Sequence, residues 1–208
     1  MTAEIIIIGD EILLGQITDT NSAHLSKRLA EFGMAIRRIT KIGDNVDVIA
    51  QAFDEASRSS HLVISCGGLG PTHDDRTRDA AAKFLGVELA LDPRALGEIE
   101  EIYRKVGRVM SETNRVQAMI PQSAEFLSNH RGTAPGLKFS KGSAVFFCLQ
   151  GIPKEMEWMT ETYIVPYIKS LNHTSVLKWR TLRTTGVPES TLYEKTKDII
   201  EETGKDLD

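Results

Sequence analysis

The sequence predicts an α/β fold in which parallel strands are joined by helical crossovers. Short, wholly apolar runs, typical of strands that are buried on both faces, alternate with longer segments whose apolar residues recur at helical spacing. Parallel strands need such crossovers, because a tight turn can only join antiparallel neighbours. Three of the apolar runs also end directly in a loop that contains glycine.

The individual elements follow from the same patterns. Strands are expected at residues 5–8 (Ile-Ile-Ile-Ile), Ala35–Ile42, Leu62–Cys66 and Ala144–Leu149. Helices are expected over residues 20–32, closed by Gly33, after the capping residues Asp44 and Asn45, across most of residues 93–119, and from Pro153 onward.

The last part of the chain has a different residue pattern. Residues 171–175 form a short polar connection, residues 178–185 alternate like a strand, and Glu189–Thr203 has apolar residues at helical spacing. One strand and one helix make a poor independent domain. We therefore interpret the tail as a fragment of a second domain, or as an arm that packs on a partner.

Composition favours a small ligand. The 208 residues suit one domain with a small appendage, and 25 basic against 29 acidic residues give a net charge of −4. Nucleic-acid binders usually carry a basic surplus, so we expect no nucleic-acid partner. The two cysteines, Cys66 and Cys148, are expected to be buried free thiols. No run approaches the ~20 apolar residues of a membrane span and no signal peptide is visible, so we expect a cytoplasmic protein.

Three strand ends point to a common ligand site. The loops are Gly9-Asp10-Glu11, Gly67-Gly68-Leu69-Gly70 and Gly151-Ile152-Pro153. If the strands are parallel, all three emerge at the carboxyl edge of the sheet, where open α/β folds bind their ligands.

The glycine-rich loop predicts a phosphate site. Gly67, Gly68 and Gly70 allow positive φ and a close approach of backbone N–H groups to an anion. A helix that begins near residues 75–77 would direct its positive end to the same place. The alternative is a tight strand-to-helix turn without a ligand.

Acidic residues beside that loop predict a divalent cation. Asp74 and Asp75 would repel a phosphate unless a cation such as Mg²⁺ lay between them, and Asp10 and Glu11 could add oxygen ligands from the neighbouring loop. The alternative is that Asp75 only caps the next helix. No Ser-His-Asp or Cys-His pattern supports covalent catalysis.

These residues, taken together, resemble the N-terminal domain of the CinA-type competence/damage-inducible family, within the wider molybdopterin-binding (MogA/MoeA-like) fold group. The matching stretches begin at Gly9, Thr20, Gly67, Asn114, Gly132 and Gly151, and they read GDEILLGQ, TN, GGLGPTHDD, NRVQ, GTAPG and GIPKEM. They occur in the family's order over roughly residues 3–168. Asp10 departs from the threonine that is common in the family, and looks like the molybdopterin-transferase version of the loop.

The resemblance implies a three-layer α/β/α sandwich around a mostly parallel mixed sheet, over residues 1–170. It implies metal-dependent hydrolysis of a nucleotide diphosphate such as ADP-ribose. Molybdopterin binding and adenylylation is the alternative from the relatives named for that pterin, and a non-catalytic nucleotide-binding or assembly module is a third. It also implies a homodimer, and residues 176–208 look like part of a KH-like domain without the GXXG loop that RNA binding needs.

The residues expected to carry this function fall into two groups. Asp75, Asp74 and Asp10 are the predicted catalytic and metal-binding carboxylates. The predicted ligand contacts are Gly67, Gly68, Gly70, Pro71, Thr72, Thr77, Glu11, Gly15, Asn21, Asn114, Arg115, Gly132, Thr133, Gly151 and Pro153.

Overall fold

The computed structural model describes residues 1–171 and 183–203. The chain divides into two compact units, Met1–Leu177 and Lys178–Asp208. In the described part of the second unit there is one helix, α9 (Glu189–Thr203), which confirms the helix expected there. The strand expected over residues 178–185 lies mainly outside the described residues, and residues 183–185 form no strand.

A six-stranded sheet forms the centre of the first unit, in the order β2-β1-β3-β8-β7-β6. The strands are β1 (Thr2–Ile8), β2 (Ala35–Ile42), β3 (Leu62–Cys66), β6 (Glu125–Leu127), β7 (Gly136–Lys141) and β8 (Ala144–Leu149). The four strands from β2 to β8 pair in parallel, whereas β7 and β6 join antiparallel. The mostly parallel mixed sheet is therefore confirmed.

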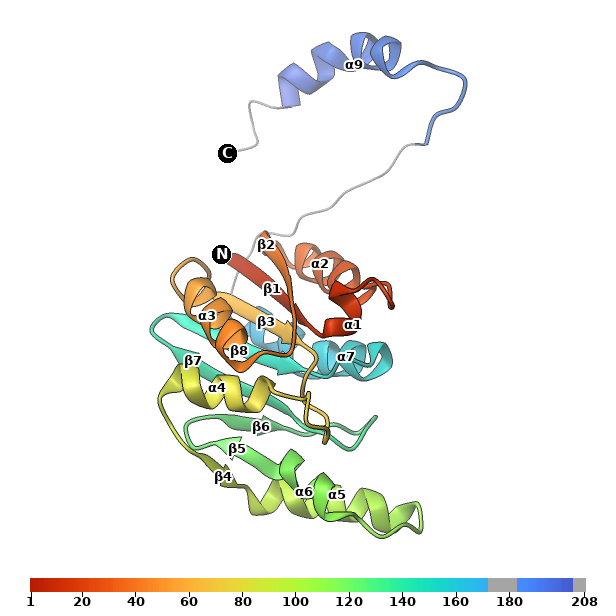
Figure 1. Ribbon diagram of the computed structural model, residues 1–208. Helices are drawn as coiled ribbons and strands as arrows, with labels where there is room; N and C mark the ends of the chain where they lie inside the picture. The colour runs from red at the N-terminus through yellow and green to blue at the C-terminus, as the bar shows by residue number, and fades with distance from the viewer. Residues whose placement is uncertain (172–182, 204–208) are drawn as a thin grey trace. The chain divides into compact units, whose positions relative to one another are not determined.

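Helices cover both faces of this sheet (Figure 1). One face carries α3 (Val46–Ser57) and α4 (Thr77–Leu85), and the other carries α2 (Asn21–Glu31), α7 (Pro153–Met159), the π-helical turn η2 (Thr160–Ile164) and α8 (Val165–Ser170). In β1, Ile6 packs in one apolar cluster and Ile5 in the other, because successive side chains of a strand point to opposite faces. The three-layer sandwich is thus confirmed.

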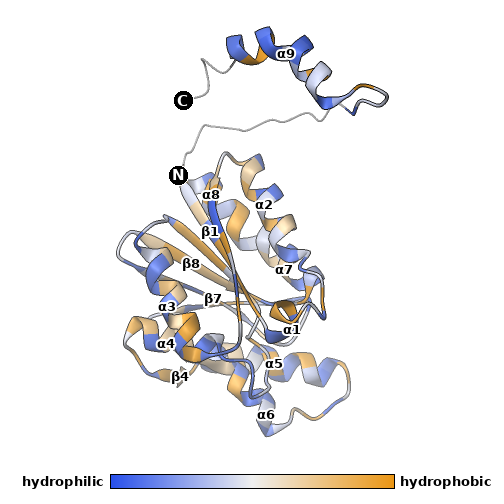
Figure 2. Cartoon of the chain, turned by 45° about the horizontal axis from the view of Figure 1, so that its top comes forward, coloured by the Kyte–Doolittle hydropathy of each residue, from blue (hydrophilic) through white to orange (hydrophobic). Residues whose placement is uncertain are grey.

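The apolar pattern of the strands follows from this burial. Every residue of β3 is buried, as are the residues of β1 after Thr2. Figure 2 shows these strands as hydrophobic ribbons between helices that carry many hydrophilic residues. The edge strand β2 is largely exposed, and Arg37, Arg38 and Lys41 place charges along it, a common protection against pairing with other chains.

The segment over residues 93–119 is only partly the helix that we expected. It contains α5 (Pro93–Lys105), α6 (Glu112–Arg115) and the 3-10 turn η1 (Val116–Ala118). Gly107, with φ of 65°, interrupts the helix. Met119 begins strand β5 (Met119–Pro121), which pairs antiparallel with β4 (Leu89–Leu91) in a separate small sheet. The prediction of helix as far as Met119 was therefore wrong at its end.

No helix among the described residues is long and apolar enough to span a bilayer. At the carboxyl end of β1, the short helix α1 (Asp10–Leu13) begins after the single residue Gly9.

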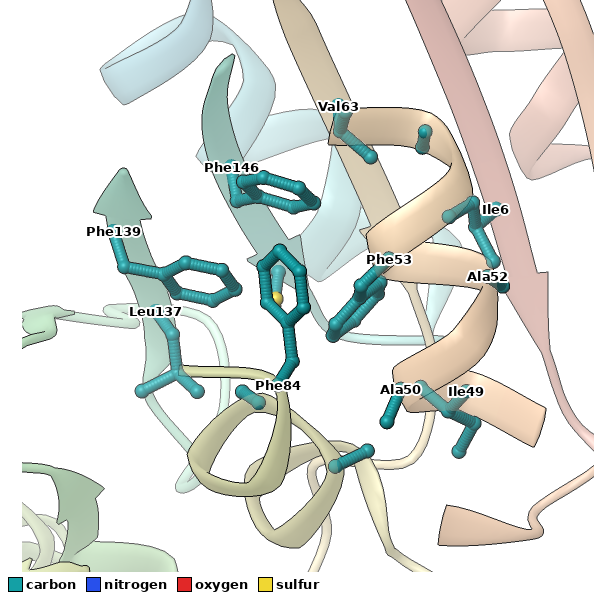
Figure 3. Packing of buried hydrophobic residues seen from close by; sticks show 14 of the residues in the cluster. Ile6, Ile49, Ala50, Ala52, Phe53, Val63, Phe84, Leu137, Phe139 and Phe146 are labelled. Atoms are coloured by element: carbon teal, nitrogen blue, oxygen red, sulfur yellow. The ribbon is translucent and has the colours of Figure 1, made fainter. Parts of the chain in front are cut away.

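The core between the sheet and α3–α4 is built around Phe53. Its side chain is 0% exposed, and its ring centroid lies 5.6 Å from that of Phe146, 5.9 Å from Phe84 and 6.1 Å from Phe139. Figure 3 shows these rings meeting from two helices and two strands. Phe84 belongs to α4, so this cluster fixes the helix that follows the glycine-rich loop.

We predict that Phe53→Ala lowers the free energy of unfolding by about 3–5 kcal/mol, because it removes buried surface and leaves a cavity. Phe53→Leu should cost markedly less, since it keeps most of the apolar volume. Urea unfolding of both variants measures the two losses. A loss below about 1 kcal/mol for Phe53→Ala would contradict this view of the core.

Candidate functional site

A pocket of about 540 Å³ lies at the carboxyl edge of the parallel strands. It is lined from the loop after β1 by Gly9 and Glu11, from the loop after β3 by Gly67, Gly68, Leu69 and Gly70, and from the loop after β8 by Gly151 and Pro153. The expected meeting of these three loops is confirmed.

The loop of residues 67–70, here called the glycine loop, is bound to the first turn of α4 through all four of its carbonyl oxygens. Thr77 donates from Oγ1 to Gly67 (2.8 Å) and from its backbone N to Gly68 (2.9 Å). Arg78 donates from Nη1 to Leu69 (2.5 Å) and from Nη2 to Gly70 (2.7 Å). These bonds hold the carbonyl side of the loop against the protein.

The backbone N–H groups of the same loop are largely available. Gly67 donates to Leu149 O at 3.0 Å. The N–H groups of Gly68, Leu69 and Gly70 meet no acceptor within the described residues, although all three residues line the pocket. Consecutive unpaired N–H groups in such a loop, next to the start of a helix, form a site for an anion.

Glycine is required at two positions of this loop. Gly67 has φ of 112° and Gly68 has φ of 67°, a region that other residues rarely adopt. A Cβ on Gly67 would collide with the carbonyl oxygen of Ile8, and one on Gly68 with Thr77 Oγ1. Backbone conformation and close packing therefore both exclude a side chain.

Carboxylates dominate the charged residues around the pocket. Its lining contains Glu11, Asp19, Asp44, Asp74 and Asp75, and neither lysine nor arginine is found among the lining residues that the structure describes. An anion would therefore meet donors on the glycine loop and negative charge on the surrounding walls.

Asp75 closes the turn that follows the glycine loop. Its Oδ2 accepts from Thr72 N at 2.8 Å and from Thr72 Oγ1 at 2.5 Å. The helix α4 begins at Thr77 with Arg76 at its N-cap and no side-chain cap, so the alternative of Asp75 as a helix cap is wrong. The same bonds occupy both donors of Thr72. We had expected Thr72 to contact the ligand, but it does not line the pocket.

Asp10 is at the expected edge of the sheet, but it does not line the pocket with Asp75. Its side chain lies against Gly43 and lines an adjoining pocket of about 780 Å³, which shares Asp44 and Asp74 with the first. Across residues 1–171 and 183–203, no three His, Cys, Asp or Glu side chains are grouped so that they alone could hold a metal ion. The predicted metal trio of Asp10, Asp74 and Asp75 is thus not assembled as such.

Asp44 lies between the two pockets and was missed in the sequence. Its Oδ2 accepts from the backbone N of Asp10 at 3.0 Å. Partial burial raises its pKa, and repulsion from Asp10, Glu11 and Asp74 acts in the same direction. A usable signal was present, because Gly43-Asp44 follows the end of β2 just as Gly9-Asp10 follows β1.

Asp19 is a second lining carboxylate that sequence reasoning missed. Its side chain is 1% exposed and accepts from Ser22 N at 2.9 Å and from Ser22 Oγ at 2.5 Å, with Lys41 Nζ at 3.1 Å. Burial alone would raise its pKa, but these hydrogen bonds outweigh burial and hold the pKa below its ordinary value. Asp19 is therefore a fixed negative charge at the start of α2.

Asn21 is among the predicted contacts that do line the pocket. Its Nδ2 donates to Gly151 O at 2.7 Å and to Cys66 Sγ at 3.1 Å. The side chain therefore joins the loops after β3 and β8 to α2. Cys66 is buried, as expected, and burial raises the pKa of its thiol to about 12.

Several predicted contacts are not brought into the pocket. Asn114 donates to the hydroxyl of Tyr103, and Arg115 lies 3.9 Å from Glu112 on the same short helix. The other predicted contacts outside the lining are Gly15, Pro71, Thr72, Thr77, Gly132 and Thr133. Thr77 acts instead through the glycine loop.

Gly132 packs against the buried carboxylate of Glu155 in α7. Any Cβ on Gly132 would collide with the carboxylate of Glu155, which is 8% exposed and accepts from Asn129 Nδ2 at 2.6 Å. Burial raises the pKa of Glu155. The loop that contains Gly132 is therefore held to the first turn of α7, directly after the lining residue Pro153.

Comparison with known proteins places this chain in a family. Residues 4–170 match the family described as a probable molybdopterin binding domain. The CinA-like protein of Kosmotoga olearia is 47% identical over 97% of this chain and 48% of its own length. The crystal structure of the protein CinA, of unknown function, from Thermoplasma acidophilum is 37% identical with a TM-score of 0.75, over 81% of this chain and 99% of that one.

The chain belongs to the molybdopterin-binding domain family and, within it, to the CinA-like proteins. It spans about half the length of the curated relatives that it matches. The molybdopterin biosynthesis enzyme MoaB from Thermus thermophilus shares the fold, with a TM-score of 0.54 at 20% identity over 85% of this chain and 99% of that one. The resemblance noted in the sequence is thereby confirmed.

Glu155 gives a prediction about pH. Since the pKa of its carboxyl is higher in the folded chain than in the unfolded chain, the group stabilises the fold below the unfolded value and loses this contribution as pH rises through the folded value. Glu155→Gln stays neutral and can still accept from Asn129. We expect the variant to be more stable than the parent at pH 8, with the difference vanishing near pH 4.

Urea midpoints at the two pH values measure this difference. Glu157→Gln, an exposed change on the same helix, is the matched control. A gain of the same size in the control would show that net charge, rather than burial, is responsible.

Proposed function

We propose that this domain binds a phosphate-bearing nucleotide together with a divalent cation and hydrolyses its phosphoanhydride bond, with ADP-ribose as the representative substrate. The observation that carries this proposal is the pairing of three available N–H groups on the glycine loop with carboxylates on the pocket walls. The family description supports the coarser part, a site related to nucleotides or pterins.

The cation follows from the charge of the lining. A diphosphate in a pocket with five carboxylates and no lining lysine or arginine, among the described residues, would be repelled unless a cation intervened. Mg²⁺ commonly binds through one or two carboxylates, with substrate phosphates and water completing its coordination. This ligand set suits Asp74 and Asp75, and it does not require three protein ligands to be grouped beforehand.

We assign the remaining steps of the reaction to groups of the protein. The N–H groups of Gly68, Leu69 and Gly70 hold the phosphoryl oxygens and stabilise the charge that develops during attack. Asp44, whose pKa is raised, accepts the proton of the attacking water. Asp74 and Asp75 would hold the cation, which would lower the pKa of that water and neutralise the diphosphate. Water oxygen joins one phosphorus, the bridging P–O bond breaks, and two phosphomonoesters leave.

We predict that Asp75→Asn and Asp44→Asn each lower Mg²⁺-dependent release of AMP from ADP-ribose by about 100-fold or more, because each removes a carboxylate from the reacting groups. Asp54→Asn, on the exposed surface of α3 and away from the lining, should leave turnover unchanged. Circular dichroism checks the fold of each variant. Full turnover in both site variants, or turnover of the parent in EDTA, would refute the proposed mechanism.

A second candidate is the binding or adenylylation of molybdopterin. The observation that favours it is the family description itself, which covers residues 4–170. The same glycine loop would hold the pterin phosphate, and the same carboxylates would need the same cation. A third candidate, a non-catalytic nucleotide-binding or assembly module, uses the pocket without a reaction. The homodimer stays a prediction.

Calorimetry with molybdopterin and with ADP-ribose, each with Mg²⁺, separates these candidates. We expect ADP-ribose to bind more tightly and to compete with molybdopterin for one site, because its diphosphate offers more oxygens to the loop and the cation. Tight binding of molybdopterin with none of ADP-ribose would reassign the domain to pterin chemistry. Tight binding of ADP-ribose without hydrolysis would identify a binding module.

A further inference from the structure

The second residue of α4, Arg78, is a buried cation behind the glycine loop. It is 3% exposed, and its guanidinium donates to the carbonyl oxygens of Leu69 and Gly70. It forms no ion pair within 4 Å among the residues that the structure describes, whereas nearby Arg76 pairs with Asp79 at 3.5 Å. The guanidinium charge is thus held by neutral carbonyl groups.

Keeping such a charge inside the protein is unfavourable. Removing a guanidinium from water costs free energy that neutral carbonyl partners only partly restore. Burial lowers the pKa of Arg78, and the attraction of Asp75 and Asp79 opposes that effect. A guanidinium nevertheless remains protonated in proteins. The positive charge therefore persists behind a pocket whose lining is acidic.

Through its bonds to the loop carbonyls, Arg78 influences how the glycine loop presents its N–H groups. A peptide group is planar, so the N–H of each residue is fixed relative to the preceding carbonyl. The carbonyl of Leu69 shares a peptide plane with the N–H of Gly70, so Arg78 fixes the direction of that N–H. The plane after Gly70 leads to Pro71, which has no N–H, so the second bond of Arg78 holds the end of the loop. Thr77 fixes the planes that carry the N–H groups of Gly68 and Leu69 in the same way.

We infer that Arg78 is a positioning residue of the anion site, with two effects on a phosphate that binds the glycine loop. It keeps the N–H of Gly70 directed to the pocket and holds the end of the loop, and its unneutralised charge offsets the carboxylate of Asp75. The inference rests on the phosphate site of the proposed function. It requires neither hydrolysis nor a particular base.

The alternative is that Arg78 only stabilises the fold. The two readings differ in what they predict for ligands with and without a phosphate. A loss of general stability would weaken the apparent binding of AMP and adenosine alike, since both ligands need the folded chain and share the same base and sugar. A positioning role acts on AMP alone.

The test compares Arg78→Met, Arg78→Lys and the parent chain. Titration calorimetry with Mg²⁺ gives the Kd for AMP, which has no anhydride bond to cleave, and displacement of AMP gives the affinity for adenosine. We expect Arg78→Met to weaken AMP binding by about tenfold or more, the size of losing charge-assisted hydrogen bonds. Adenosine binding should be unchanged. Arg78→Lys keeps the charge and should recover part of the AMP affinity.

Lys83→Met is the matched control, because it removes one positive charge from an exposed position on the same helix. It should leave both affinities unchanged. Equal weakening of AMP and adenosine, or no change in AMP, in the Arg78 variants would overturn the inference. If Arg78→Met does not fold, Arg78→Lys alone must still weaken AMP binding and spare adenosine binding, since a lysine ammonium lacks the planar fork that holds both carbonyls in a fixed geometry. Absence of AMP and ADP-ribose binding in the parent would instead refute the proposed function.

Discussion

The hydrogen bonds between the first turn of α4 and the carbonyls of the glycine loop are the constraint on which the site depends. They take up every carbonyl of the loop and leave three consecutive N–H groups toward the pocket. The helix that supplies these donors is itself fixed by Phe84, which packs against Phe53 and Phe146 in the core. The geometry of the glycine loop is therefore inherited from buried aromatic packing.

Charge is distributed unequally on the two sides of this loop. Arg78 lies behind it without an ion pair in the described chain, while the pocket walls carry carboxylates that include Asp19, Asp44 and Asp75. Neither arrangement favours folding by itself. The charge of Arg78 is buried without a counter-ion, and the carboxylates of the pocket walls repel one another. Under the proposed function, a phosphate and a cation in the pocket would compensate both. Uncompensated charges of this kind are typical of sites that bind ligands.

The sequence predicted most of the architecture, since long apolar runs and helical spacing are strong local signals. It missed β6 and β7, where Leu137 and Phe139 alternate with polar residues over a run too short to stand out. At the site, glycine positions were predictable because backbone geometry is a local property. The roles of Asp19 and Arg78 were not, because they depend on contacts with Lys41 and with loop carbonyls that only the fold brings near. Asn114 matches the family motif, but its side chain bonds Tyr103 and lies outside the pocket lining, which a motif match alone cannot show.

The chain contains two glycine–aspartate pairs at strand ends, and the two aspartates have different roles. Gly9-Asp10 follows β1 and Gly43-Asp44 follows the neighbouring β2, so both pairs emerge at one edge of the sheet. The backbone N of Asp10 donates to the carboxylate of Asp44, which orients Asp44 at the boundary between the two pockets. The first pair thus supplies a donor and the second supplies the carboxylate. Both carboxylates line the adjoining pocket, where repulsion from Asp10 contributes to the raised pKa of Asp44, and the hydrogen bond from the Asp10 backbone partly offsets that repulsion.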